Sequence, residues 1–278
     1  MNKPIVVAEI GINHNSSIDI AKKLIDVASN AGVCYVKFQK RSVRDSTPQD
    51  QWDVPKNTPW GTVEPYISYR EKMEFSLEQY EQIDSYCKQV GIKWFASAWD
   101  IPSVEFLSHW DLDFVKIPSA KLTDDSLVVA CAKTFPTILS TGMSTRDEIQ
   151  RAKFLIQRES PNPYLLHCHS AYPSPDSELN LALILEYKKR WPELYIGFSS
   201  HSVSPFPAIY AAAWGAEMIE VHVTLDRAMS GSDHAASLEP HGLQLVVREI
   251  NRLQEIWGQP EKKVWDSELK ARERLRGK

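Results

Sequence analysis

The sequence has no apolar run near the roughly 20 residues that a membrane-spanning helix needs. Its first residues, MNKPIVVAEIG, lead straight into a short apolar segment and lack the longer apolar core and cleavage site of a secretory signal peptide. Only four cysteines occur and none forms a CxxC pair, which indicates reduced thiols in the core rather than a disulfide framework. We therefore expect a cytoplasmic protein with no membrane partner.

Strong net charge, glycine-rich motifs and linkers are also missing. The formal net charge is only -4, so electrostatics give no reason to expect nucleic acid or an anionic membrane as a partner. No G-x-G-x-x-G motif follows the first apolar run, which argues against a dinucleotide-binding open sheet. With 43% hydrophobic and 24% charged residues, the composition is that of a soluble globular protein.

The chain does contain eight short apolar runs that alternate with longer amphipathic segments. The runs predict strands at 4–10, 34–39, 93–98, 114–119, 136–141, 164–170, 194–200 and 218–224. The amphipathic segments predict helices at 18–32, 76–91, 101–110, 125–135, 145–159, 177–191, 205–215 and 241–258. Strands that are apolar on both faces, with helical crossovers, are typical of a parallel sheet. Because barrels of eight such units typically occupy about 250 residues, we predict one α/β domain over residues 1–278, a (β/α)8 TIM barrel.

Two segments fall outside this repeat. Residues from about 41 to 75 form a long insertion after the second strand, which we predict to be irregular and to lie at the face where the strands end. The chain finishes in a short basic tail, KVWDSELKARERLRGK, for which we predict a solvated helix.

Polar side chains occur at the carboxyl ends of the predicted strands, where TIM barrels carry their active sites. They are Glu9, Lys37, Gln39, Ser97, Lys116, Ser119, Thr141, His167, His169, Tyr172, Ser199, His201 and His222, with Asp233 in the last loop. Lys37 and Lys116 occupy inward positions, where an unpaired ammonium is costly, so together they favour a phosphate or carboxylate ligand. The alternative is that either lysine pairs structurally with Glu9 or with an acidic loop.

Two histidines, His201 and His222, end successive strands at equivalent depth. With Glu9 and Asp233 nearby, they suggest the nitrogen and oxygen ligands of a divalent metal beside an anionic, phosphorylated substrate. The alternative is that each is a hydrogen-bonded core histidine.

A second pair, His167 and His169, has the HxH spacing of metal-dependent barrel hydrolases. Such pairs usually end the first strand, where this chain has Glu9, so we expect His167 and His169 to be mainly structural. Asn57, in the long insertion, is a further candidate for contact with a substrate hydroxyl.

Several segments of the chain resemble the sialic acid synthases, that is, the N-acetylneuraminate synthases and their legionaminate and pseudaminate relatives. The matching segments are AEIGINHN (8–15), YVKFQ (35–39), FVKIPS (114–119), PTILSTGMS (136–144), LLHCHSAYPSP (165–175), IGFSSHS (196–202) and EVHVTLDRAMSGSDHAASLEP (220–240). Each match is weak by itself, but their order and spacing are specific to this family.

The resemblance implies an enzyme that condenses phosphoenolpyruvate with N-acetylmannosamine or a related 2-acetamido sugar. By position it implies a substrate-binding set of Lys37, Gln39, Ser97, Lys116, Ser119 and Ser199, catalytic groups Glu9, Asp233 and Tyr172, and metal ligands His201 and His222. The implied metal is Mn²⁺, with Mg²⁺ or Co²⁺ as alternatives. A homodimer is expected from the resemblance alone.

The chain also departs from the family pattern at positions near the sugar. Family members commonly have Thr at Ser97, Asn at Ser170 and Glu at Lys121, so the identity of the sugar stays open. They typically continue into an antifreeze-like domain that contacts the acetamido group, and no such sequence follows the last helix here. We therefore expect a different sugar, a separate antifreeze-like protein, or binding without that contact.

Two other functions remain as alternatives. The barrel could condense phosphoenolpyruvate with another aldose to make a different 3-deoxy sugar acid, or it could bind sugars or partners without turnover. No separate motif for a second phosphate stands out in the sequence, which favours an unphosphorylated acceptor.

Overall fold

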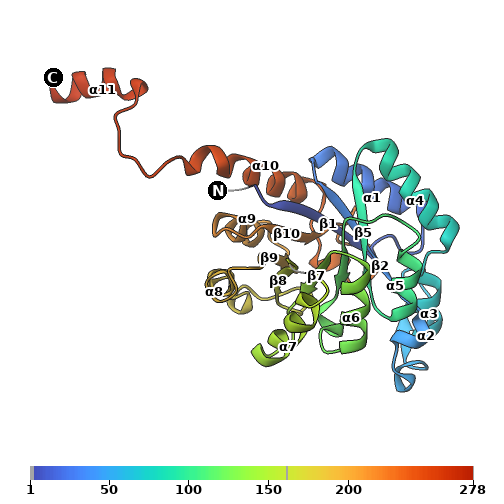
Figure 1. Cartoon of the computed structure of the whole chain (residues 1–278). Coiled ribbons are helices and arrows are strands. Elements are labelled where there is room, and N and C mark those ends of the chain that lie inside the picture. The colour runs from blue at the N-terminus through green and yellow to red at the C-terminus, as the bar shows by residue number, and fades with distance from the viewer. Residues whose placement is uncertain (1–2, 161, 278) are drawn as a thin grey trace.

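The protein forms a closed barrel of eight parallel strands surrounded by helices (Figure 1). The computed structural model describes residues 3–160 and 162–277. The barrel strands are β1 (Ile5–Gly11), β2 (Tyr35–Lys40), β5 (Lys93–Ala98), β6 (Val115–Ile117), β7 (Thr137–Ser140), β8 (Tyr164–Cys168), β9 (Tyr195–Ser200) and β10 (Met218–His222). They pair in the order β1-β10-β9-β8-β7-β6-β5-β2 and close back on β1. The predicted (β/α)8 fold is therefore confirmed.

Eight helices form the outer layer and correspond to the eight predicted ones. They are α1 (Ile18–Ala31), α4 (Leu77–Val90), α5 (Ile101–Leu107), α6 (Asp125–Thr134), α7 (Arg146–Gln157), α8 (Ala182–Arg190), α9 (Phe206–Ala213) and α10 (Pro240–Trp257). Ser76 and Thr145 start α4 and α7 with capping boxes, in which side chain and backbone donors are satisfied reciprocally. Helix α8 begins later than predicted, because a 3-10 turn and the positive φ of 44° at Asn180 interrupt the segment before it.

The barrel interior changes from apolar to polar along the strands. Its lower layer is a separate cluster of Val7, Phe95, Ile138, Leu166 and Met218. Side chains two residues further along a strand point to the same face, so the next layer up carries different residues from the same strands. That layer, here called the polar layer, consists of Glu9, Lys37, Ser97, Lys116, Ser199 and Glu220, all buried. The alternation of the strands thus places a charged floor directly above the apolar core.

The insertion at 41–75 is more ordered than predicted. It contains a short helix α2 (Val43–Ser46), an antiparallel hairpin of β3 (Pro55–Asn57) and β4 (Val63–Pro65), and a longer helix α3 (Tyr66–Met73). The hairpin turn is closed by Thr58, whose backbone N–H donates to the Thr62 carbonyl at 2.9 Å. The prediction of an irregular loop was therefore wrong. Local hydrogen bonds hold the hairpin, and such contacts need no periodic apolar pattern by which the sequence could reveal them.

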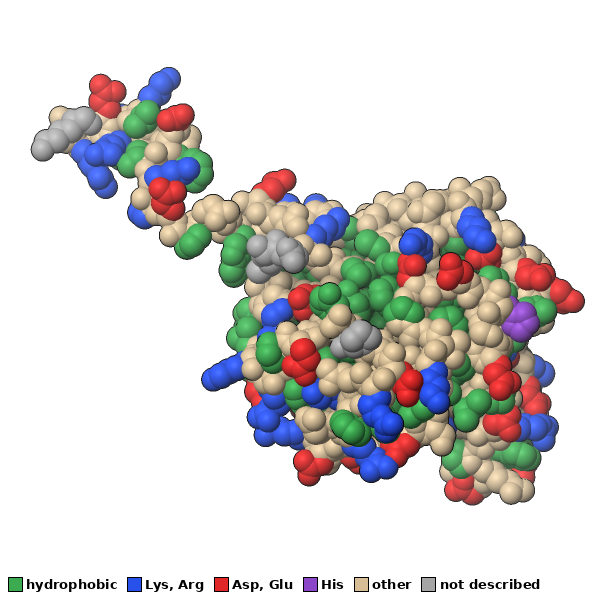
Figure 2. Space-filling model, in the orientation of Figure 1, with side chains coloured by type: hydrophobic (Ala, Val, Ile, Leu, Met, Phe, Trp, Pro, Cys, Tyr) green, Lys and Arg blue, Asp and Glu red, His purple; other side chains and the backbone are tan. Residues whose placement is uncertain are grey.

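The basic tail forms helix α11 (Asp266–Arg276), which projects away from the barrel after α10 (Figure 1). None of its residues is buried, as predicted for a solvated helix. Figure 2 shows basic and acidic side chains interspersed over the visible face of the barrel. Within the described ranges, no helix is both long and apolar enough to cross a bilayer.

Candidate active site

A cavity opens at the carboxyl ends of the strands, directly above the polar layer. Its volume is about 160 Å³, and every barrel strand contributes at least one lining residue. The lining residues are Glu9, Lys37, Gln39, Ser97, Trp99, Lys116, Pro118, Ser119, Ala120, Ser140, Met143, Cys168, Ser170, Tyr172, Ser199, His201, Glu220 and His222. Ten of the residues predicted to form the site therefore meet in one place.

The floor of the cavity is a network of two lysines and two carboxylates. Lys37 Nζ lies 2.7 Å from Glu9 Oε2 and donates to Ser97 Oγ at 2.9 Å. Lys116 Nζ lies 2.5 Å from Glu220 Oε1, which also accepts a hydrogen bond from Ser199 Oγ at 2.9 Å. These contacts confirm that the lysines point inward and show that each has a carboxylate partner.

Glu220 was not predicted as a site residue, although it is 1% exposed and connects the two halves of the network. Its Oε2 is 3.8 Å from Lys37 Nζ. Burial tends to raise the pKa of Glu220, but the ammonium groups of Lys116 and then Lys37 outweigh burial and hold the pKa below its usual range. The available signal was the position of Glu220 two residues before His222, which places both side chains on the same face of β10.

The two ammonium groups lie in one desolvated layer, and Lys37 and Lys116 supply the lysine side chains of the cavity lining. Burial lowers the pKa of Lys116, and the carboxylate of Glu220 opposes that shift. The hydroxyls of Ser97 and Ser199 already contact this network. An anion entering the cavity would meet two lysines and several hydroxyl donors, which suits a phosphate or carboxylate group.

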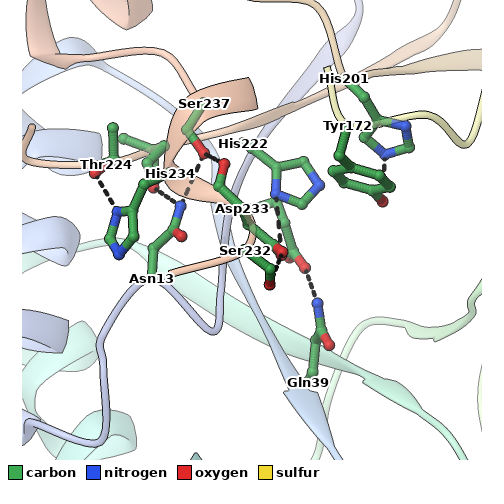
Figure 3. A network of polar contacts seen from close by, with 12 residues as sticks. Asn13, Gln39, Tyr172, His201, His222, Thr224, Ser232, Asp233, His234 and Ser237 are labelled. Atoms are coloured by element: carbon green, nitrogen blue, oxygen red, sulfur yellow. Dashed lines mark hydrogen bonds and ion pairs between the residues drawn. The ribbon is translucent and has the colours of Figure 1, made fainter. Parts of the chain in front are cut away.

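The predicted histidine pair lies above the floor, at the ends of β9 and β10. The ring centroids of His201 and His222 are 5.1 Å apart. His201 Nδ1 donates to the carbonyl of His169 at 2.5 Å, and its Nε2 accepts from the Tyr172 hydroxyl at 2.9 Å (Figure 3). Burial, and then the neighbouring His222, lower the pKa of His201 to about 3, so this imidazole is neutral at physiological pH.

Asp233 lies beside His222 rather than in the cavity wall. Its Oδ2 is 3.8 Å from His222 Nδ1, a buried nitrogen that has no hydrogen-bond partner within the described chain. The loop that carries Asp233 is fixed by Ser237, whose Oγ donates to the Asp233 carbonyl at 2.7 Å and accepts from Asn13 Nδ2 at 2.8 Å (Figure 3). Asn13 and Ser237 thus support the loop, a role that was not predicted.

The donor atoms around this pair suit a divalent metal. Residues 3–160 and 162–277 contain no group of three or more His, Cys, Asp and Glu side chains gathered in metal-binding geometry. However, His201 and His222 are close together, His222 offers an unpartnered nitrogen, and Asp233 supplies a carboxylate nearby. Neutral imidazole with carboxylate is a donor set typical of Mn²⁺, Zn²⁺ or related ions.

Three of the polar residues at the strand ends make structural contacts. His167 Nε2 is 2.7 Å from the Leu179 carbonyl, and Thr141 Oγ1 donates to the Leu166 carbonyl at 3.1 Å. His169 contacts Glu178 at 3.0 Å, and its carbonyl accepts from His201. These contacts agree with the mainly structural role expected of the HxH pair.

Asn57 is not brought to the cavity. It lies on β3, pairs with Val63 across the hairpin and is exposed. The prediction of a substrate contact for Asn57 is not supported, because the hairpin directs this residue toward solvent.

Comparison with known proteins finds relatives of this chain among the sialic acid and legionaminic acid synthases. A model of the NeuB family matches residues 24–262. The N-acetylneuraminate-9-phosphate synthase of Mus musculus is 34% identical, with 97% of this chain and 76% of that protein covered. The N,N'-diacetyllegionaminic acid synthase of Campylobacter jejuni is also 34% identical, over 97% of this chain and 82% of that protein. A solved N-acetylneuraminic acid synthetase from Leptospira borgpetersenii is 29% identical, covers 100% of this chain and 94% of its own, and superimposes with a TM-score of 0.85.

Proposed function

We propose a reaction for this chain from one premise: it belongs to the NeuB family, and is an enzyme that forms carbon–carbon bonds. The proposed reaction condenses phosphoenolpyruvate with N-acetylmannosamine or a related 2-acetamido sugar to give a sialic-acid-like nonulosonate and phosphate. The observation that carries this proposal is the buried polar layer, in which Lys37 and Lys116 lie beneath the histidine pair.

The polar layer is suited to hold phosphoenolpyruvate. Lys37 and Lys116 would bind its phosphate and carboxylate, and Ser97, Ser119 and Ser199 would add neutral donors around them. The lysines are already held in place by carboxylates, so little reorganisation is needed when the anion binds. Glu9 and Glu220 also keep the layer close to neutral before the substrate arrives.

The chemistry then proceeds at the carbon atoms of phosphoenolpyruvate. Its methylene carbon bonds to the aldehyde carbon of the open-chain sugar, whose oxygen takes up a proton and becomes a hydroxyl. Positive charge develops at the adjacent carbon, where the Glu9 carboxylate can stabilise it and can accept a proton from the attacking water. Loss of phosphate from the resulting tetrahedral carbon leaves a keto acid, so one water is consumed for each phosphate released.

The residues above the floor act on the sugar. His201 and His222, with Asp233 beside them, would hold a divalent metal such as Mn²⁺, which would polarise the aldehyde oxygen. Tyr172 stacks on His201 with ring centroids 4.1 Å apart, so it covers the side of the cavity where the sugar would lie.

The test is phosphate release from phosphoenolpyruvate with Mn²⁺ and one of four additions: N-acetylmannosamine, its 6-phosphate, mannose, or no sugar. We expect release that requires a 2-acetamido sugar. Lys116→Gln should lower kcat/KM by about 100-fold or more, because it removes a charged donor from the buried layer. Lys93→Gln, which alters an exposed pair with Asp113, is the matched control. Folded, metal-loaded protein that releases no phosphate with any sugar would refute the proposal.

A further inference from the structure

One short loop, residues 169–174 after β8, contacts His201 at three points. The His169 carbonyl accepts from His201 Nδ1 at 2.5 Å, and the backbone N–H of Ser174 donates to the His201 carbonyl at 2.9 Å. The third contact is made by the Tyr172 hydroxyl, which lies 2.9 Å from His201 Nε2 (Figure 3). Both ring nitrogens of His201 are therefore engaged by the same loop.

These contacts determine which nitrogen of His201 carries the hydrogen. A carbonyl oxygen can only accept a hydrogen bond, so the hydrogen must be on Nδ1. The neutral imidazole then has its lone pair on Nε2, where it accepts from the phenol of Tyr172. A histidine that binds a metal usually donates its other ring N–H to a carbonyl or carboxylate, as His201 does. His201 can thus bind an ion only through Nε2.

The hydroxyl of Tyr172 and a metal ion would need the same lone pair. An imidazole nitrogen without a hydrogen has a single lone pair, which either accepts a hydrogen bond or bonds to a metal. The ring of Tyr172 also contacts both histidines of the pair, with centroids 4.1 Å from His201 and 5.5 Å from His222. The hydrogen bond and metal ligation therefore exclude each other at His201.

Tyr172 can move without disturbing the rest of the loop. It is 46% exposed, whereas His201 is 5% exposed. The loop backbone is held separately by Ser174, whose Oγ lies 2.9 Å from the Ala171 carbonyl and 3.2 Å from the His169 carbonyl. Rotation of the phenol toward solvent would therefore break one hydrogen bond to His201 and leave the other two contacts in place.

We propose that Tyr172 competes with the divalent metal for the lone pair on His201 Nε2, and in this way sets the metal affinity of the site. This inference rests on the proposed function, which assigns the metal to His201 and His222. Tyr172 acts here as a positioning residue, through His201. Without its hydroxyl, metal binding no longer has to break a hydrogen bond, so the affinity should rise. A hydroxyl that helped to hold the metal, directly or through water, would have the opposite effect when removed.

The test measures the dissociation constant of Mn²⁺ for chelator-treated protein, with free Mn²⁺ quantified by electron paramagnetic resonance. Tyr172→Phe keeps the stacked ring and should bind Mn²⁺ about 2- to 10-fold more tightly than the wild type, the equivalent of one net hydrogen bond. In a His201→Ala background, the same substitution should give no gain, because the contested lone pair is absent. Tyr86→Phe is the matched control: its hydroxyl donates to Asp26 at 2.8 Å outside the cavity, so the affinity should not change.

Unfolding gives a second readout that does not require turnover. At one high Mn²⁺ concentration, the metal should raise the free energy of unfolding by about 0.4 to 1.4 kcal/mol more in Tyr172→Phe than in the wild type, which is the same 2- to 10-fold change. Unchanged or weaker Mn²⁺ affinity in Tyr172→Phe would overturn the inference, as would a wild-type protein with no Mn²⁺ affinity.

The proposed reaction is judged separately, by phosphate release. Release that requires a 2-acetamido sugar, together with unchanged Mn²⁺ affinity in Tyr172→Phe, would refute the competition and keep the reaction. Tighter Mn²⁺ binding by Tyr172→Phe, in a protein that releases no phosphate with any sugar, would support the competition and refute the reaction.

Discussion

Glu220 contacts both lysines of the polar layer and is therefore the residue on which the geometry of the cavity floor depends most. It lies 2.5 Å from Lys116 Nζ and 3.8 Å from Lys37 Nζ, and accepts a hydrogen bond from Ser199. Removing one partner of a buried ion pair leaves the other charge uncompensated, which costs far more than the pair contributes when intact.

We therefore predict that Glu220→Gln, which keeps the shape of the side chain, lowers the free energy of unfolding by about 3 kcal/mol. Urea unfolding at pH 7 measures this change. Asp125→Asn is the control: it breaks a largely exposed pair with Arg151 and should cost no more than about 1 kcal/mol. Equal losses in the two variants would show that Lys116 does not depend on Glu220.

His14 provides a prediction about acid stability. It lies outside the proposed metal site, is 3% exposed and stacks on Phe75 with ring centroids 4.1 Å apart. Burial lowers its pKa to about 3, with His234 adding to the shift and a hydrogen bond to the backbone of Gly11 opposing it. In the unfolded chain the imidazole has the ordinary pKa of about 6.5. Between about pH 3 and 6.5 the unfolded chain therefore binds a proton at His14 that the folded protein does not bind.

Stability should therefore be unaffected by His14 above about pH 6.5 and should fall as the pH drops toward 3, by about 1.4 kcal/mol per pH unit from this group. His14→Gln should make the slope of unfolding free energy against pH shallower by that amount between pH 4 and 6. The exposed His241 is the control, since His241→Gln should leave the slope as it is. Parallel slopes for the wild type and His14→Gln would contradict the prediction.

The strands and helices of the barrel could be predicted because their residues repeat the same local pattern eight times. Apolar strand runs, caps such as Ser76 and Thr145, and C-terminal glycines such as Gly32 and Gly91 are all properties of neighbouring residues. The hairpin of β3 and β4 has no such signal, because it is held by backbone contacts and has few buried side chains. Periodicity therefore located the barrel but not the structure of the insertion.

Gly197, in β9, shows how closely the elements of the barrel interior pack. A Cβ built at this position would lie 2.4 Å from Leu166 Cδ2 and 2.6 Å from the carbonyl oxygen of Met218. We predict that Gly197→Ala lowers the free energy of unfolding by about 3 kcal/mol, since backbone of β10 must shift to make room. Gly242→Ala, in α10, meets only ordinary contacts of 3.4 Å or more and should be neutral or stabilise by up to about 1 kcal/mol. Thermal unfolding of both variants measures the difference. If Gly197→Ala proved as stable as Gly242→Ala, the barrel interior would be less tightly packed around β9 than the structure indicates.

The candidate site was predicted less completely than the fold, because some of its residues are identified only by contacts between strands that are remote in sequence. Lys37, Lys116, His201 and His222 could be identified because they interrupt apolar strands at corresponding depths. Glu220 interrupts β10 in the same way, but its importance depends on contacts with β6 and β2, which are remote in sequence.

Closure of the barrel brings residues from both ends of the chain to one cavity. The parallel pairing of β1 with β10 sets Glu9 beside His222, 213 positions apart in sequence by their residue numbers. A ligand that contacts these groups binds only the closed barrel, because the unfolded chain does not hold them together. Ligand binding at the cavity should therefore stabilise the fold as a single unit.

This coupling gives a test of the metal site that is independent of catalysis. Mn²⁺ added to chelator-treated protein should raise the free energy of unfolding by about 2.7 kcal/mol when its free concentration is 100 times its dissociation constant. The double variant His201→Ala, His222→Ala should lose this increase, because it removes the two nitrogen donors that β9 and β10 bring within reach of each other. His109→Ala, His241→Ala removes two exposed imidazoles instead and should keep the full increase. Each variant serves as its own metal-free reference, so any change in its intrinsic stability cancels. An undiminished Mn²⁺ effect in the first double variant would place the metal, if one binds, away from the histidine pair.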